Sequence, residues 1–205
     1  MKPPVSPEWR SRVLELISGR PLPQTEKEQS KARDIQFELF VAARCRASGY
    51  LVEPKEPDIL VRDECGNFGI AAKRPKSSKT LERHIRKGSH QIVGSGMPGI
   101  VAIDLSLIHN PENKILLFDE HGDDIKIVQR IADCFVQLNS RRIRSMVKLP
   151  NVFGVAVCMT SLSFVSNTLQ FASATRWTIS NLCEMSDGHY GQLRKFAVRF
   201  AAGIS

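Results

Sequence analysis

The residues best suited to chemistry lie in two short apolar segments close together in the sequence. Residues 57–61 (PDILV) carry Asp58 near their start, and residues 68–75 (FGIAAKRP) carry Lys73 near their end. Alternate side chains of a strand share a face, so Ala71 and Lys73 point the same way. Two adjacent strands would bring the Asp58 carboxylate and the Lys73 ammonium to neighbouring places. Such a pair can position a divalent metal ion and a water molecule beside a phosphate.

Together with Glu38 in the preceding helical segment, this spacing resembles the PD-(D/E)xK nucleases, the superfamily with restriction-endonuclease-like folds. The family pattern is an acid on a helix, Pro-Asp at the start of one strand, and Glu-x-Lys on the next. Asp58 and Lys73 match the pattern, but Ala71 stands where the family has its Glu. The resemblance covers roughly residues 30–106 and rests on a short motif. It implies an α/β fold in which helices flank a mixed β-sheet.

The resemblance also implies roles for individual residues in metal-dependent hydrolysis. Mg²⁺, or Mn²⁺, prefers oxygen ligands, here the Asp58 carboxylate and the backbone carbonyl of Ala72. The metal would lower the pKa of a bound water and act as a Lewis acid. Lys73 would orient or help deprotonate that water, or stabilise the phosphate charge. Glu38 would face the metal site from its helix, and some family members place a Gln at the position of Gln91 facing the active centre.

The apolar surroundings of Glu38 are a separate reason to place this residue in the site. Its neighbours in residues 37–43 (FELFVAA) are apolar on both sides, which raises a carboxyl pKa unless a cation or hydrogen bond compensates. A metal-bound water or Lys73 would serve as that partner. The alternatives are a solvated Glu38 on the polar side of the helix, a turn role for Asp58 after Pro57, a solvated strand end for Lys73, and a packing or capping role for Gln91.

Three explanations compete for Ala71. The chain is an engineered Glu-to-Ala variant that no longer cuts, or the missing acid has moved to another element, with Glu82 as the nearest candidate, or the protein has lost catalysis and kept binding. We favour the first, because the residues around Ala71 otherwise match the motif. An alanine side chain cannot bind metal.

A cluster of basic residues follows the motif and suits contacts with phosphates. Such contacts fix a nucleic-acid backbone in register without reading its sequence. The cluster comprises Arg74, Lys76, Lys79, Arg83, Arg86 and Lys87. A charge run is also typical of a solvated helix face. A second basic stretch, residues 141–148, either extends the surface that binds nucleic acid or stabilises a helix by placing positive charges at its C-terminus, the negative end of the helix dipole.

Composition sets the outer bounds. A chain of 205 residues with 42% hydrophobic and 24% charged residues fits one globular domain, and a net charge of +8 favours polyanionic partners. Five widely spaced cysteines without a Cys-x-x-Cys predict neither a disulfide framework nor a zinc ribbon. The apolar runs 99–105 and 152–159 are too short to span a membrane, and residues 1–4 open no signal peptide. We therefore expect a cytoplasmic protein.

The secondary structure expected from these patterns is an N-terminal helical arm in residues 1–24 and a single nuclease-like domain in residues 25–205. Capping and periodicity predict helices, and apolar runs predict strands. Expected helices span about 6–17, 25–47, 80–93, 123–147 and 190–201; expected strands span about 57–62, 68–74, 100–105, 152–159, 161–173 and 175–179. The strand at 100–105 should be buried on both faces and parallel to a neighbour.

The sequence thus favours a metal-dependent endonuclease acting on nucleic acid, with DNA as the preferred substrate and defence against foreign DNA, restriction or repair as its setting. The rival from another class is a catalytically inactive nucleic-acid-binding module of the same fold. A third interpretation is a subunit whose basic face contacts an acidic protein partner, and a homodimer stays open.

Overall fold

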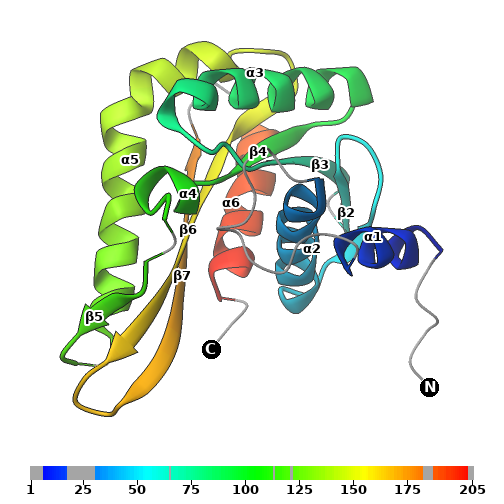
Figure 1. Ribbon diagram of the computed structural model, residues 1–205. Coiled ribbons are helices and arrows are strands. Elements are labelled where there is room, and N and C mark those ends of the chain that lie inside the picture. Colours follow the sequence, from blue (N-terminus) through cyan, green and yellow to red (C-terminus); the bar gives the residue numbers. More distant parts are fainter. Residues whose placement is uncertain are drawn as a thin grey trace.

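A mixed seven-stranded β-sheet organises the chain, with helices on both of its faces (Figure 1). The computed structural model describes residues 7–17, 31–64, 66–112, 114–120, 122–181 and 187–202. The expected α/β class is therefore confirmed. In chain order the elements are α1 (Pro7–Ile17), α2 (Lys31–Ala47), β1 (Leu51–Glu53), β2 (Ile59–Asp63), β3 (Gly66–Lys73), α3 (Ser78–Ser95), β4 (Gly99–Asp104), α4 (Ser106–His109), β5 (Leu116–Phe118), α5 (Asp123–Val147), β6 (Val152–Val165), β7 (Gln170–Asn181) and α6 (Asp187–Ala202).

The strands follow the order β1-β2-β3-β4-β6-β5, and β7 pairs with β6. Strands β1, β2 and β3 form an antiparallel meander, whereas β3, β4, β6 and β5 run parallel to one another. Every residue of β4 is buried, as expected for a strand covered on both faces. The parallel orientation of β4 beside β3 is also confirmed.

Two apolar cores lie on opposite faces of the sheet, because alternate strand residues point to opposite sides. Ala71 and Val101 pack under α3 and α5 in one core. Ala72 and Ala102 pack under α2 and α6 in the other. These neighbouring residues of β3 and β4 therefore stabilise different layers, and the sheet separates an α3/α5 face from an α2/α6 face.

The largest departure from the expected elements lies in the last third of the chain. The separate strands expected at 161–173 and 175–179 are wrong, because β6 continues to Val165 and pairs with β7 along a single antiparallel hairpin. Residues 166–169 form the turn, where Leu169 has φ +52°. The Ser-Asn-Thr sequence of residues 166–168 is typical of a turn and marks where β6 ends.

The helices at 80–93 and 123–147 are confirmed, the first with a longer span in α3. Helix α3 ends at Gly96, which has φ +69° and supplies the left-handed residue that commonly closes a helix. The expected start of the helix at 25–47 lies outside the described residues, as do the boundaries of the helical arm. None of the helices within the described ranges combines the length and apolarity needed to span a membrane.

Candidate active site

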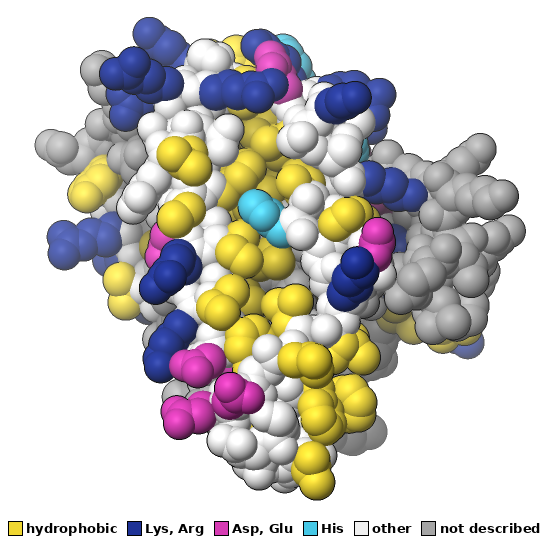
Figure 2. Space-filling model, turned by 60° about the vertical axis from the view of Figure 1, so that its left-hand side comes forward, with side chains coloured by type: hydrophobic (Ala, Val, Ile, Leu, Met, Phe, Trp, Pro, Cys, Tyr) yellow, Lys and Arg dark blue, Asp and Glu magenta, His cyan; other side chains and the backbone are white. Residues whose placement is uncertain are grey.

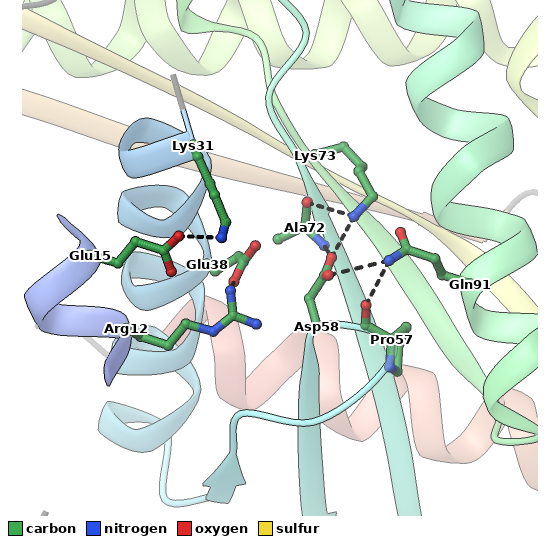
Figure 3. Close-up of polar contacts among 9 residues, drawn as sticks. All are labelled: Arg12, Glu15, Lys31, Glu38, Pro57, Asp58, Ala72, Lys73 and Gln91. Carbon is green, nitrogen blue, oxygen red and sulfur yellow. Dashed lines mark hydrogen bonds and ion pairs between the residues drawn. The ribbon is translucent and has the colours of Figure 1, made fainter. Parts of the chain in front are cut away.

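Asp58 and Lys73 meet where β2 begins and β3 ends. The Lys73 ammonium Nζ donates to Asp58 Oδ2 at 2.5 Å and to the carbonyl oxygen of Ala72 at 3.1 Å. The backbone N–H of Ala72 donates to the same Asp58 oxygen at 2.8 Å (Figure 3). Both side chains are 11% exposed. The sequence motif therefore corresponds to a partly buried cluster in which an acid, a lysine and a backbone carbonyl converge.

The local sequence explains how β2 and β3 hold this cluster. Asp58 directly precedes β2, whose residue Ile59 pairs with Ile70 of β3, so Asp58 lies opposite the end of β3 that carries Lys73. Gly69 lets the two segments approach closely, because a Cβ at this position would lie 2.5 Å from Cδ of Pro57. The proline ring thus occupies the space that a side chain at residue 69 would need.

Gln91 joins the cluster from α3. Its side-chain Nε2 donates to the carbonyl oxygen of Pro57 at 3.1 Å and more weakly to Asp58 Oδ1 at 3.4 Å. Its amide oxygen Oε1 is buried and has no hydrogen-bond partner among the residues that the structure describes. A buried acceptor without a donor is energetically costly. Gln91 therefore faces the Asp58–Lys73 pair (Figure 3), with one oxygen left to bind a cation or a water molecule.

Glu38 reaches the same region from α2 (Figure 3). Burial, and next the negative charge of Asp58, raise the pKa of Glu38 to about 7, while Arg12 and Lys73 act in the opposite direction. Arg12 of α1 forms an ion pair with Glu38 at 2.9 Å. Glu38 is thus not a solvated surface residue: its side chain is 14% exposed. Two carboxylates that repel each other in this way favour a bound cation.

Ala71 is fully buried in the core beneath α3. Gly88 of α3 packs against it: a Cβ added at Gly88 would lie 3.3 Å from Cβ of Ala71 and 2.8 Å from Cγ1 of Val101. A glutamate at position 71 would have to displace these neighbours. The packing therefore suits a small residue at this place, and it gives the interpretation of an engineered Glu-to-Ala change no support.

The structure does not bring Glu82 to the cluster. Its carboxylate is bound by Arg86 at 2.9 Å and by Arg142 of α5 at 3.1 Å. These two contacts place Glu82 on the surface between the two helices. The suggestion that Glu82 replaces the missing acid of the motif is therefore not favoured by its position.

The oxygens suited to Mg²⁺ or Mn²⁺ are those of Glu38, Asp58, the Ala72 carbonyl and Gln91. This donor set fits a hard cation, which takes carboxylate, carbonyl and amide oxygens. The repulsion between the two acids and the unpartnered oxygen of Gln91 point the same way. Within the described part of the chain no group of three or more His, Cys, Asp or Glu residues is arranged as a metal site. Any cation here would therefore depend on backbone and amide oxygens.

The basic residues do not all fall on one surface. Arg74 turns inward and pairs with Asp104 at 3.0 Å, and Lys76 is half-buried. Four others are exposed on α3: Lys79, Arg83, Arg86 and Lys87. The Glu82 contact with Arg142 joins this helix to the second basic stretch on α5. Figure 2 shows Lys and Arg side chains gathered at the upper end of one face around a single acidic side chain.

Two functional candidates were not apparent from the sequence. Asp104 closes β4, and the carboxyl end of a parallel strand is a common place for binding residues in open α/β sheets. That position was the available signal. No sequence pattern indicates a role for Arg12, because its contact with Glu38 depends on how α1 packs against α2.

Comparison of the chain with models of known protein families gives no match, and no curated protein matches it significantly. What the fold defines is therefore the class: an α/β protein with a mixed seven-stranded sheet between two layers of helices. The particular function has to be argued from the site.

Proposed function

We propose that this protein is a metal-dependent nuclease of the PD-(D/E)xK type that hydrolyses phosphodiester bonds of nucleic acid, with DNA as the substrate. The observation that carries the proposal is the 2.5 Å contact between Lys73 Nζ and Asp58 Oδ2, beside the raised pKa of Glu38. A structural ion pair alone requires neither a second buried carboxylate nor an unpartnered amide oxygen at the same place. The basic surface of α3 and α5 supplies contacts for the phosphate backbone.

Each side chain of the cluster would have a distinct role in the reaction. A divalent cation at Asp58 and the Ala72 carbonyl would supply the charge that stabilises the phosphate oxygens and lowers the pKa of water. Glu38, with a pKa of about 7, can accept a proton from an attacking water near neutral pH. Lys73 holds its ammonium between Asp58 and the Ala72 carbonyl, where it can stabilise a phosphate oxygen. Gln91 orients Asp58 through its side-chain amide.

A cleavage assay tests the proposal. The chain and its Ala71→Glu variant are incubated with labelled plasmid, linear duplex and single-stranded DNA and RNA, with and without Mg²⁺ or Mn²⁺. Metal-dependent cutting that disappears in Lys73→Ala supports the nuclease. Lys126→Ala is the matched control, because Lys126 is an exposed lysine that pairs with Asp123 away from the cluster. Absence of cutting in both forms, or cutting retained in Lys73→Ala, contradicts it.

The second candidate is a catalytically inactive nucleic-acid-binding module of the same fold. The observation that favours it is the tight packing of Ala71 against Gly88 and Val101, which suits alanine where the motif requires an acid. This candidate predicts binding that weakens steeply with salt, with no cleavage in any metal. The same assay, combined with a binding titration, separates the two candidates.

A further inference from the structure

A pocket of about 320 Å³ opens on the α2/α6 face of the sheet, beside the candidate active site. It lies at the carboxyl end of β4, where open α/β sheets commonly bind ligands, and beside the middle of β6. Consecutive residues at the end of β3 connect the two places. Lys73 turns to Asp58, whereas Arg74 turns to Asp104 and lines the pocket.

Arg74 reaches the pocket with part of its guanidinium uncommitted. Its Nε donates to Asp104 Oδ2 at 3.0 Å. The other oxygen of Asp104 accepts from the backbone N–H and the hydroxyl of Ser106. Within the described residues the terminal amino groups of Arg74 form no hydrogen bond. Since an arginine presents five N–H donors in a rigid fork, these groups are suited to a phosphate.

One wall of the pocket is aromatic. Phe37 and Phe40 lie one turn apart on α2 and both line it. Each ring stacks against Trp177 with centroids 6.1 Å apart and an interplanar angle of 16°. Phe40 is 37% exposed although its ring is held by this stack. A fixed and accessible aromatic face is typical of a surface on which a nucleic-acid base stacks.

The rim supplies groups that can contact the edge of a base. Gln36 lines the pocket, and within the described residues its side-chain amide is engaged only through its oxygen, by Arg33. Its N–H donors are thus left for an acceptor such as a base carbonyl. Lys114 also lies at the rim, but its ammonium already pairs with the Glu112 carboxylate at 2.7 Å, so Arg74 is the main candidate for a phosphate. Aromatic wall, amide donor and guanidinium together match the base and the phosphate of one nucleotide.

We propose that this pocket binds a single unpaired nucleotide of the substrate strand, with its base against Phe40 and a phosphate at Arg74. The inference rests on the proposed function, because it assigns the substrate of the neighbouring site. A base inside a duplex is stacked on both faces and paired along one edge and cannot enter, so the occupant must be unpaired or extruded. The protein should therefore prefer single-stranded tails, flaps or unpaired positions to a blunt duplex.

The test is a binding titration by fluorescence anisotropy, with Ca²⁺ in place of Mg²⁺ to suppress cutting. Two labelled oligonucleotides are compared: a blunt duplex and the same duplex with a single-stranded tail. We expect the tailed form to bind about tenfold more tightly, which is the scale of one base-aromatic stack. In Phe40→Ala the two affinities should become nearly equal. Phe40→Tyr, which keeps an aromatic ring, should retain the preference for the tailed form.

Phe171→Ala is the matched control, because Phe171 is an aromatic residue that is exposed on β7 and does not line the pocket. It should leave the preference unchanged. A free nucleoside monophosphate should compete with the tail and not with the blunt duplex. Equal binding of tailed and blunt forms, or a preference that survives in Phe40→Ala, contradicts the nucleotide pocket and leaves the proposed function standing. Failure to bind any oligonucleotide contradicts both, even if the free nucleotide binds.

Discussion

Two ion pairs flank the end of β3, and they differ in what they leave unsatisfied. In the Arg74–Asp104 pair both carboxylate oxygens are bound, by Ser106 and by the guanidinium, so the donors of Arg74 are what remains. Beside the Lys73–Asp58 pair lies a second carboxylate with a raised pKa, and the Gln91 oxygen has no partner within the described part of the chain. The first place is suited to an anion and the second to a cation. Two consecutive residues, Lys73 at the end of β3 and Arg74 just after it, thus take part in sites of opposite chemistry.

The comparison predicts different structural costs for losing each acid. Asp104→Ala should lower the free energy of unfolding by about 4 kcal/mol, because it leaves Arg74 partly buried without its partner. Asp58→Ala should cost less, about 2 kcal/mol, because it also removes the repulsion with Glu38. Urea denaturation followed by circular dichroism measures both. A larger cost for Asp58→Ala would mean that Asp58 is mainly structural.

Glu38 should make stability depend on pH. Its pKa rises from 4.5 to about 7 on folding, so the folded state keeps a proton that the unfolded state has lost. The associated stability is fully present below pH 4.5 and is lost as the pH rises through 7, by up to about 3 kcal/mol. Denaturation at several pH values checks this. Glu38→Gln should flatten the profile, and an unchanged profile would remove Glu38 as its source.

The origin of the raised pKa can be resolved by substitution. Asp58→Asn should lower the pKa of Glu38, because it removes a negative charge, and Arg12→Ala should raise it further, because it removes a positive one. A carbon-13 NMR titration of the Glu38 carboxyl measures both shifts. Shifts in the same direction would show that the two charges do not act on Glu38 as the geometry indicates.

The basic surface should contribute through salt-dependent contacts alone. Arg83→Ala should weaken nucleic-acid binding to a similar extent for all sequences and reduce the slope of log K against log salt by about one. Arg130→Ala, a basic residue near the start of α5, is the control. An unchanged slope in Arg83→Ala would mean that the phosphate contacts lie elsewhere on the protein.

Sequence patterns predicted the elements in which a periodic or continuous pattern of apolar residues extends over many positions. Helix α5 and the buried strand β4 follow directly from their apolar residues. The three-residue strands β1 and β5 and the four-residue helix α4 are too short to show a period and were not predicted. Apolar and polar residues alternate well beyond residue 159, which is why the length of β6 was underestimated.

The site was predictable where its residues are fixed by one hairpin. Asp58 and Lys73 meet because β2 and β3 pair in a register that the apolar pattern sets. The partners Arg74 and Asp104 are 30 residues apart, Arg74 directly after β3 and Asp104 at the end of the parallel strand β4, and only the sheet order brings them together. The close packing of Gly88 against Ala71 depends likewise on how α3 lies on the sheet. Such contacts are set by tertiary packing rather than by local pattern.

The central claim is that the cluster around Asp58 is a cation site, and titration calorimetry with Mn²⁺ tests it most directly. We predict that one Mn²⁺ binds per chain, more tightly as the pH rises through 7, because Glu38 must lose its proton. Asp58→Asn should abolish this binding, whereas Asp104→Asn, at the other ion pair, should retain it. Binding that is equal in the wild type and Asp58→Asn, or absent from the wild type, would contradict the account.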